Sequence, residues 1–344
     1  MGTLTQRRPL GSSEARVTTL GFGGASLGNL YREISDDDAH ATLSAAWNAG
    51  IRYFDTAPFY GYGLSERRLG EFLRTRPADE RADEWVISTK VGRLLRAADA
   101  APAADGFVRP LPFAPVFDYS YAGVMRSYEE SMQRLGLGRI DVLLMHDLGR
   151  YTHGPRHEEM LAAALGGGLR AMRELKTAGA VRAIGLGVNE ISICEQVLER
   201  HDLDCILLAG RYSLLEQSPL HGLFKTCAQR AVSIIVGGPY NSGILATGSR
   251  AASPKFDYGD ASKDVLGRVR RIESICERHG VAMPAAALQF CLAHPVVASV
   301  IPGLANPREV RDTLAYSNAA IPAAFWEELH SEQIIASDAP VPAA

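Results

Sequence analysis

Short apolar segments alternate with helical patterns eight times along the 344-residue chain, and this alternation constrains the fold more than any other feature of the sequence. Strands separated by helices pair in parallel, and eight such units close into a barrel more readily than they extend as an open sheet. The predicted strands cover residues 18–23, 52–54, 85–89, 140–144, 181–185, 205–208, 232–236 and 298–301. The predicted helices cover residues 36–50, 65–74, 120–135, 158–178, 191–199, 219–230, 284–293 and 307–318. The sequence therefore predicts an α/β fold, a (β/α)8 TIM barrel that forms a single domain over residues 1–344.

The segments outside this pattern predict additions to the barrel. A (β/α)8 barrel takes ~250 residues, so roughly 90 residues remain for other elements. Residues 11–27 predict an N-terminal hairpin or plug that runs into the first strand. Residues 92–118 contain four prolines and are too long for a simple connection, so we expect a lid or a disordered segment there, a mobile cover rather than part of a sheet. Residues 237–278 form a second insertion, which ends in an extra helix at 265–279.

The composition argues against several kinds of partner. The net charge of −3, the pI near 6.3 and the lack of a Lys/Arg cluster argue against a nucleic-acid-binding surface. No stretch reaches the ~18 apolar residues of a membrane span, and the first thirty residues hold no apolar signal segment, so the expected location is the cytoplasm. The five cysteines form no CxxC pair, which indicates buried reduced thiols rather than disulfides or zinc. The sequence does not indicate an oligomeric state.

Ionisable residues close three successive predicted strands. Asp55 closes the second strand, and Tyr60 lies in the loop that follows it. Lys90 closes the third strand, and His146, followed by Asp147, closes the fourth. Because the functional groups of such barrels gather at the carboxyl-terminal ends of the strands, we expect these side chains to converge. The predicted catalytic group consists of Asp55, Tyr60, Lys90 and His146.

The residue types of this group are those of proton transfer. The chain has 31 arginines but five lysines, so a lysine at the end of an apolar strand indicates a chemical role. Its ammonium can stabilise a phenolate and lower the pKa of Tyr60, while Asp55 holds Lys90 in place. A neutral His146 can donate a hydrogen bond to a substrate oxygen. The alternatives are a buried Asp–Lys pair that closes the barrel mouth, a tyrosine that packs on the rim and a histidine that serves the core.

The four residues lie in the motifs DTAxxY, STK and LMHD, which resemble the aldo-keto reductase superfamily. The resemblance spans nearly the whole chain, from GFGGASLG near the N-terminus through GLGVN to VIPGLANP. It implies a nicotinamide dinucleotide bound across the barrel mouth and a hydride transfer between its C4 atom and a substrate carbon. On this resemblance Tyr60 donates or accepts the proton, and His146 positions the substrate oxygen. Asp55 and Lys90 tune the tyrosine.

The resemblance also carries the family's cofactor contacts onto this chain. Asn189, at the end of the fifth strand, matches the family's carboxamide-binding asparagine. Two positions depart from the family pattern: Gly237 stands where many members stack a tyrosine on the nicotinamide, and Ala209 stands where many carry a glutamine. Tyr240 and Arg211 are the candidates to compensate. The predicted cofactor-binding residues are Gly24, Asn189, Gly238, Pro239, Gly243, Gly303, Glu309 and Asp312.

The loop after the last strand predicts the choice of cofactor. NADP-preferring members commonly place Lys, Arg and Ser around the 2′-phosphate there, whereas here Arg308 is the one cation between residues 303 and 309. Glu309 stands where a family arginine often lies, so a 2′-phosphate would meet a like charge, and a ribose hydroxyl could donate to the carboxylate. Asp312 matches an acid that contacts adenine. The sequence therefore predicts NAD⁺ over NADP⁺, and with it oxidation as the physiological direction.

Within the superfamily, the segments FDYSYAGVMRSYEESMQRLGL, HDLGRYTHG and LAGRYSLL look like a branch of bacterial aldose 1-dehydrogenases, L-fucose dehydrogenases and pyridoxal 4-dehydrogenases. This implies a small hydroxylated substrate, either an aldose oxidised at C1 or pyridoxal, with a lactone as the product in both cases. The sequence does not choose between the sugar and pyridoxal. Phe59, His146 and residues 92–118 are the expected walls of the substrate site.

Other functions have weaker support in the sequence. The Rossmann fingerprint is incomplete, because no third glycine follows GFG or GLG at the required spacing. The motifs GxxxxGK[ST] and HExxH do not occur. His153 and His157 lie in a Gly/Pro loop without a third ligand, so no metal site is predicted. An NADPH-dependent reductase of aldehydes and ketones remains an alternative, as does a regulatory subunit that binds the cofactor without turnover, although the intact catalytic group argues against the regulatory subunit.

Overall fold

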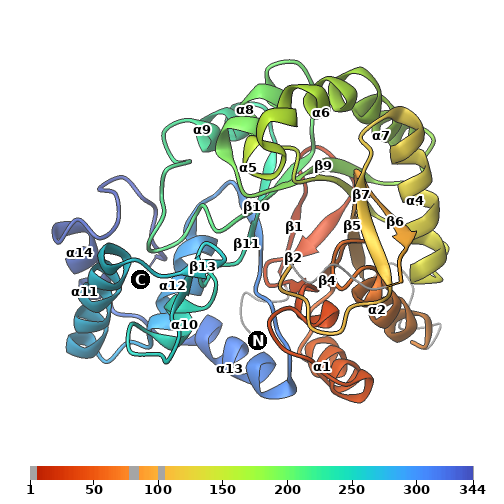
Figure 1. Cartoon of the computed structure of the whole chain (residues 1–344). Coiled ribbons are helices and arrows are strands. Elements are labelled where there is room, and N and C mark those ends of the chain that lie inside the picture. Colours follow the sequence, from red (N-terminus) through yellow and green to blue (C-terminus); the bar gives the residue numbers. More distant parts are fainter. Residues whose placement is uncertain (1–5, 77–84, 100–104, 344) are drawn as a thin grey trace.

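The computed structural model describes residues 6–76, 85–99 and 105–343. Its centre is a barrel of eight parallel strands (Figure 1). In sheet order these are β3 (Phe22–Gly23), β4 (Tyr53–Asp55), β5 (Val86–Val91), β8 (Val142–His146), β9 (Ala183–Val188), β10 (Cys205–Ala209), β11 (Ser233–Gly237) and β14 (Val297–Ile301). Bridges from Leu20 to Val300 and from Gly23 to Gly303 join the first strand to the last. The predicted (β/α)8 barrel is confirmed.

The barrel interior is a packed core. Strands β5, β9 and β14 are buried at every residue, as parallel strands covered on both faces are expected to be. Side chains such as Tyr53, Leu144 and Ile235 form one cluster inside the barrel. Leu10 and Val17, from the N-terminal hairpin, belong to the same cluster. The hairpin therefore closes one end of the barrel, and the carboxyl-terminal ends of the strands remain for a functional site.

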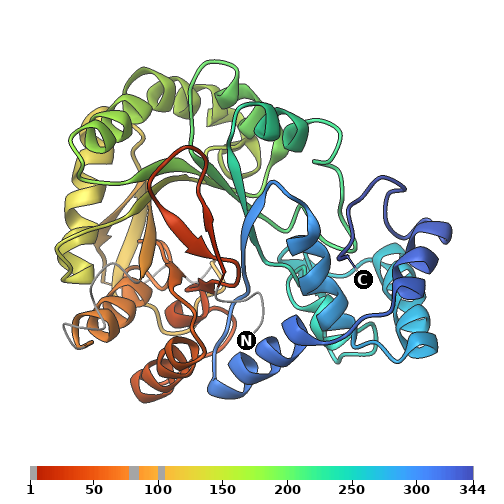
Figure 2. The same ribbon diagram turned by 180° about the vertical axis from the view of Figure 1, so that it is seen from behind.

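The N-terminal hairpin begins earlier than predicted. Strand β1 (Arg7–Pro9) pairs in antiparallel fashion with β2 (Arg16–Thr18), and Figure 2 shows the hairpin lying across the barrel. Because the hairpin already uses Thr18, the first barrel strand is shorter than the predicted strand at 18–23. The prediction of a hairpin or plug before the first strand is correct, but its bounds are not.

A layer of helices surrounds the barrel. The helices that follow the barrel strands are α1 (Asp36–Asn48), α2 (Leu64–Arg74), α4 (Tyr121–Leu135), α6 (His157–Ala163), α7 (Leu169–Thr177), α8 (Ile191–Leu198), α9 (Leu223–Gln229), α12 (Met283–Ala293) and α13 (Pro307–Asn318). Ser35 and Ser120 cap α1 and α4 by accepting hydrogen bonds from backbone N–H groups of the first turn. No helix in the described ranges is both long enough and apolar enough to cross a membrane.

The single helix predicted over 158–178 is interrupted. A π-helical turn, Ala164–Gly168, separates α6 from α7. The three consecutive glycines of this turn lower the local stability of an α-helix. A Cβ atom on Gly168 would lie 2.4 Å from the carbonyl oxygen of Tyr119. The close approach of the two backbones therefore requires glycine, and the helical pattern alone did not indicate it.

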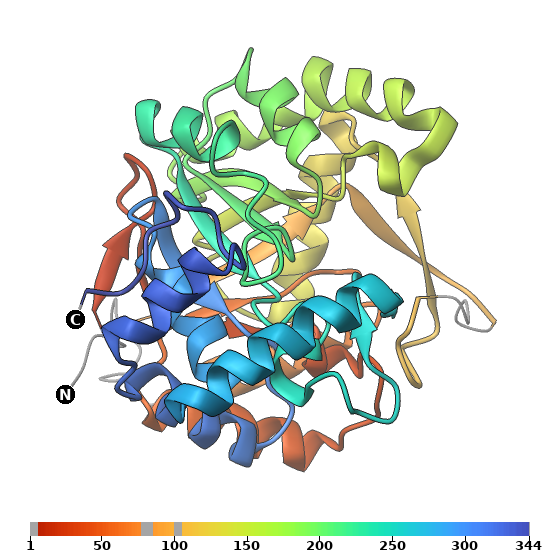
Figure 3. The same cartoon turned by 90° about the vertical axis from the view of Figure 1, so that its left-hand side faces the viewer.

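Residues 92–118 contain an antiparallel ribbon, so the expectation that this segment forms no part of a sheet is wrong. Strand β6 (Arg93–Ala97) pairs with β7 (Phe113–Phe117), and residues 100–104 lie outside the described residues. The ribbon projects from the barrel in Figure 3. A two-stranded ribbon consists of edges, where a proline such as Pro115 is tolerated. The prolines therefore did not exclude strands here.

The second insertion carries most of the remaining elements. It contains α10 (Ile244–Thr247), the short strands β12 (Lys255–Phe256) and β13 (Gly259–Asp260), and α11 (Lys263–His279). The extra helix predicted at 265–279 is thereby confirmed. A further helix, α14 (Ala323–Ser331), was not predicted and packs against α11 (Figure 3).

Candidate active site

Three residues of the predicted catalytic group end neighbouring strands of the barrel. Asp55 ends β4, Lys90 lies near the end of β5, and His146 ends β8. The Lys90 ammonium donates to Asp55 Oδ2 at 2.7 Å and to the Thr56 carbonyl oxygen at 2.9 Å. The Ser88 hydroxyl donates to Asp55 Oδ1 at 2.7 Å. Because the Lys90 and Asp55 side chains are 1% and 2% exposed, this ion pair is shielded from water.

Tyr60 completes the group from the loop after β4. The Lys90 Nζ atom lies 4.5 Å from the centroid of the Tyr60 ring. The His146 ring meets the Tyr60 ring edge to face, with 6.0 Å between the centroids. The loop is fixed by close backbone contact, because a Cβ atom on Gly61 would lie 2.5 Å from the Gly28 carbonyl oxygen. The structure therefore brings all four predicted residues together.

The electrostatics of the group differ from the expectation in one respect. Burial, then Asp55 and Asp147, raises the pKa of Tyr60 well above its ordinary value, against the opposing effect of Arg93. The net lowering that was expected for this pKa is therefore wrong for this arrangement, in which burial dominates and Lys90 pairs with Asp55. Burial, helped by Arg93 and Lys90, lowers the pKa of His146 well below its usual value. The imidazole is thus neutral, as expected.

Several residues near the group were not predicted. Arg93, at the start of β6, pairs with Asp147 and places its guanidinium carbon 3.8 Å from the centroid of the Phe59 ring. Phe107, on the segment that connects β6 to β7, meets the Phe59 ring at 5.3 Å and the Tyr60 ring at 6.4 Å between centroids. Phe59 thus lies against His146, and the 92–118 insertion lies against Tyr60 through Phe107. Asp147 could have been found from its place beside His146, whereas no sequence pattern indicated Phe107.

His153, which lies outside the group, has structural contacts. The Nε2 atom of His153 lies 3.0 Å from the Tyr119 hydroxyl, which donates to the His146 carbonyl oxygen at 2.7 Å. The ring of His153 also packs against Phe117. Across the described residues, no group of three or more His, Cys, Asp or Glu side chains lies together in a way that could hold a metal ion.

The strand ends on the other side of the barrel are open. Asn189 follows β9, and Gly238 and Gly303 follow β11 and β14 as exposed residues. A Cβ atom on Gly303 would meet no described heavy atom within 4 Å, and one on Gly238 would meet its nearest described neighbour, the Gly210 nitrogen, at 3.8 Å. Packing does not explain either glycine, although the φ of +58° at Gly238 by itself favours glycine there. They fit a face on which a flat, extended ligand such as a dinucleotide lies close to the backbone.

Other predicted cofactor residues have structural explanations. A Cβ atom on Gly24 would lie 2.4 Å from the Asp55 carbonyl oxygen, so the packing of β3 on β4 already requires this glycine. Gly243, with φ +101°, precedes α10, and Pro239 is buried. Tyr240 is half-buried and packs against the core between the barrel and the helices, and its role in place of the missing stacking tyrosine stays a prediction.

Arg211 is the other candidate to compensate for the missing family contacts to the nicotinamide. Its Nε–H donates to the Asn189 carbonyl oxygen at 2.6 Å, and its guanidinium pairs with Asp257 at 3.0 Å. Asp257 lies in the turn between β12 and β13. The arginine therefore ties the end of β9 to the second insertion, beside the predicted carboxamide-binding residue.

Glu309 and Asp312, on which the predicted preference for NAD⁺ rests, are both paired with arginines. Glu309 accepts a hydrogen bond from the Ala305 N–H at 2.8 Å and pairs with Arg32. Asp312 lies 3.5 Å from Arg308. Arg32 was not predicted, because it is 277 residues away from Glu309 along the chain. Two cations as well as two acids therefore lie around the start of α13.

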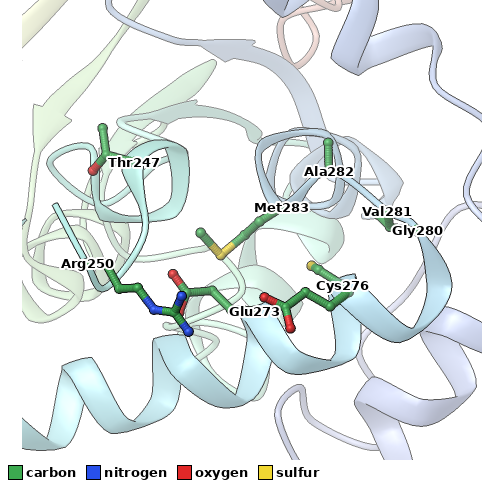
Figure 4. Close-up of a pocket in the computed structure, with 9 residues that line it drawn as sticks. Thr247, Arg250, Glu273, Cys276, Gly280, Val281, Ala282 and Met283 are labelled. Atoms are coloured by element: carbon green, nitrogen blue, oxygen red, sulfur yellow. The ribbon is translucent and has the colours of Figure 1, made fainter.

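A cavity of about 490 Å³ lies elsewhere, between α10, α11 and the start of α12 (Figure 4). Figure 4 shows Glu273 and Cys276 on one wall and Met283 on another. Its lining includes no member of the predicted catalytic or cofactor-binding residues. The strand ends, rather than this cavity, form the candidate active site.

Comparison with known proteins agrees with this geometry. The model of the aldo/keto reductase family matches residues 19–333. The chain belongs to the aldo-keto reductase family. It is therefore an oxidoreductase of a family that binds nicotinamide cofactors.

The most similar relatives include two dehydrogenases. Pyridoxal 4-dehydrogenase of Microbacterium luteolum is 46% identical, over 96% of this chain and 98% of that protein. D-threo-aldose 1-dehydrogenase of a Pseudomonas species is 40% identical, over 93% of this chain and 95% of that protein. Among solved structures, the holo form of the aldo-keto reductase AKR11C1 from Bacillus halodurans is 25% identical, with a TM-score of 0.72 and 98% of each chain covered.

Proposed function

We propose that this enzyme oxidises the hydroxyl-bearing carbon of a small cyclic hemiacetal to a lactone, with NAD⁺ as the preferred cofactor. The cyclic forms of an aldose and of pyridoxal are both hemiacetals, so one reaction covers the substrates named for the two relatives. The observation that carries the proposal is the position of the Tyr60 ring, against both the Lys90 ammonium and the His146 imidazole at the strand ends.

The residues of the catalytic group have distinct roles in this reaction. The nicotinamide, when bound, accepts the hydride from the carbon that carries the hydroxyl group. Tyr60 accepts the hydroxyl proton as the C–H bond breaks and the C=O bond forms. The neutral His146 donates a hydrogen bond to the same oxygen and so fixes its position. Lys90, held by Asp55 at 2.7 Å, stabilises the phenolate that Tyr60 must become.

The cofactor is held by the open strand ends. Asn189, which directly follows β9, binds the carboxamide, and the uncovered backbone at Gly238 and Gly303 provides room for the dinucleotide. Glu309 supports NAD⁺, because a ribose hydroxyl can donate to a carboxylate and a 2′-phosphate cannot.

A second candidate is the reduction of aldehydes or ketones with NADPH. Two observations favour it. Burial and Asp55 raise the pKa of Tyr60, which keeps the phenol protonated as an acid requires. Arg32 and Arg308 supply two cations near the adenosine end, where a 2′-phosphate would lie.

A spectrophotometric screen tests the proposed function. Purified protein is assayed with NAD⁺ and NADP⁺ against aldoses, pyridoxal and simple alcohols, and in the other direction with NADH and NADPH against aldehydes. We expect the highest kcat/KM for NAD⁺ with an aldose or pyridoxal, and a lactone as the product. A higher kcat/KM for NADPH-dependent aldehyde reduction would favour the second candidate. Nicotinamide binding without turnover on any substrate would favour a regulatory subunit.

A further inference from the structure

A charged pair outside the catalytic group lies beside His146. Arg93 is the third residue after Lys90, and it pairs with Asp147, which directly follows His146. The two paired side chains are 6% and 18% exposed. The Oδ2 atom of Asp147 lies 3.5 Å from the Nε2 atom of His146. The pair therefore borders the place where His146 meets the substrate oxygen.

Aromatic rings fix the plane of the arginine. The guanidinium carbon of Arg93 lies 3.8 Å from the centroid of the Phe59 ring and 4.8 Å from that of Phe117. The Phe59 ring in turn meets the His146 ring edge to face at 6.0 Å. Stacking of this kind restricts a planar guanidinium and leaves its N–H donors with fixed directions. Arg93 is thus held rigidly next to the catalytic histidine.

The pair is not fully satisfied by the protein. The Nε–H of Arg93 is buried and has no hydrogen-bond partner among the described residues. A buried donor left unpaired costs about 1–3 kcal/mol, and a hydrogen bond to a ligand would recover this cost. Asp147 also has a left-handed backbone conformation, with φ +43°. Such strain persists where the surroundings enforce it and concentrates at ligand-binding sites.

We propose that Arg93 and Asp147 bind the hydroxyl group on the carbon next to the reacting carbon, and thereby select an aldose over pyridoxal. This inference rests on the proposed oxidation of a cyclic hemiacetal. A guanidinium beside a carboxylate presents a donor and an acceptor side by side. One alcohol group satisfies both, because it accepts from Arg93 and donates to Asp147. In pyridoxal the neighbouring carbon belongs to the aromatic ring and carries no hydroxyl group.

The test compares the best aldose with its 2-deoxy analogue. A site built to bind a hydroxyl group discriminates strongly against an analogue that lacks it, so we expect the wild type to prefer the aldose by at least about 30-fold in kcat/KM. Arg93→Met keeps the length and the apolar stem of the side chain. In this variant the preference should fall to within about threefold, through a lower kcat/KM for the aldose and a nearly unchanged value for the 2-deoxy sugar.

Two further variants serve as controls for this comparison. Arg93→Met leaves Asp147 without its partner, so Arg93→Met/Asp147→Asn removes both charges and carries the test if the single variant does not fold. Arg139→Met is the matched control, because Arg139 also stacks on an aromatic ring, Trp85, but at the opposite end of β5. The control should keep the wild-type preference for the aldose.

The possible outcomes separate the inference from the proposed function. Equal losses for both sugars in Arg93→Met and in the double variant would assign the pair a structural role and overturn the inference. Oxidation of pyridoxal but of no aldose would also overturn it, while the proposed hemiacetal oxidation would stand. Oxidation of neither substrate class by the wild type would overturn both.

Discussion

The strand ends from β4 to β8 carry charged side chains that the protein pairs, whereas those from β9 to β14 carry mostly small or polar residues, with exposed backbone after β11 and β14 and with Arg211 as the charged exception. On the first side, Lys90 is bound to Asp55 and Arg93 to Asp147. On the second side, Gly238 and Gly303 are exposed, and a side chain at Gly303 would meet no described atom within 4 Å.

This difference indicates that the two sides of the site have different roles in the proposed reaction. Charged groups that must act on a proton are oriented by the folded protein before any ligand arrives, so little reorganisation is left for the reaction. An extended cofactor instead needs room along the backbone. The variants below perturb first one side and then the other.

Removal of Lys90 should have the largest effect among these variants. Lys90→Met leaves Asp55 buried and unpaired, so we expect a loss of about 3 kcal/mol of stability and a fall in kcat of ~10² or more. The double variant Asp55→Asn/Lys90→Met removes both charges. It should regain most of the stability, measured by urea unfolding, and remain slow. Recovery of the rate together with the stability would show that the pair is only structural.

A side chain added at the strand ends from β9 to β14 should weaken cofactor binding without unfolding the protein. Gly303→Val should raise the dissociation constant of NAD⁺ by about tenfold, which corresponds to ~1.4 kcal/mol. The measurement is quenching of protein fluorescence by the cofactor. Gly138→Val is the control, because a Cβ atom at Gly138 also meets no described atom within 4 Å. If both variants bound NAD⁺ like the wild type, the cofactor would not lie across Gly303.

The smallest effect is expected on the preference between NAD⁺ and NADP⁺, in a variant of Glu309. Glu309→Gln removes the carboxylate charge but keeps a side chain able to accept from the Ala305 N–H and so to support the start of α13. Loss of the negative charge should shift the ratio of kcat/KM for NADP⁺ over NAD⁺ upwards by about threefold, since Arg32 already offsets part of that charge. An unchanged ratio would show that Glu309 does not discriminate between the cofactors.

The catalytic side was predictable because its residues follow from strand periodicity. Asp55, Lys90 and His146 each close an apolar strand, and parallel strands bring such ends to one face. Tyr60 lies in the short loop after the second strand, so its place near the other three residues could also be predicted. The local order of the chain was therefore sufficient to predict the group, although the direction of the Tyr60 pKa shift depended on burial that no pattern reveals.

The residues and elements that were not predicted depend on contacts between segments far apart in the sequence. Arg32 pairs with Glu309 although the two are far apart in the sequence, and Phe107 packs against Tyr60 from an insertion whose prolines indicated a mobile cover. Gly168, in the π-helical turn Ala164–Gly168, is required by the approach of the Tyr119 backbone. The cytoplasmic location stays a prediction.

The proton-transfer role of Tyr60 is tested most directly by Tyr60→Phe. The value of kcat/KM for oxidation is measured from about pH 6 to pH 10, with cofactor binding as a check on the site. Since burial and Asp55 raise the pKa of Tyr60, the phenolate fraction and the wild-type rate should rise by ~tenfold per pH unit through neutrality. The variant should bind NAD⁺ normally, react at least ~10²-fold more slowly and lose this pH dependence. A variant that kept most of the wild-type rate and its pH profile would contradict the account.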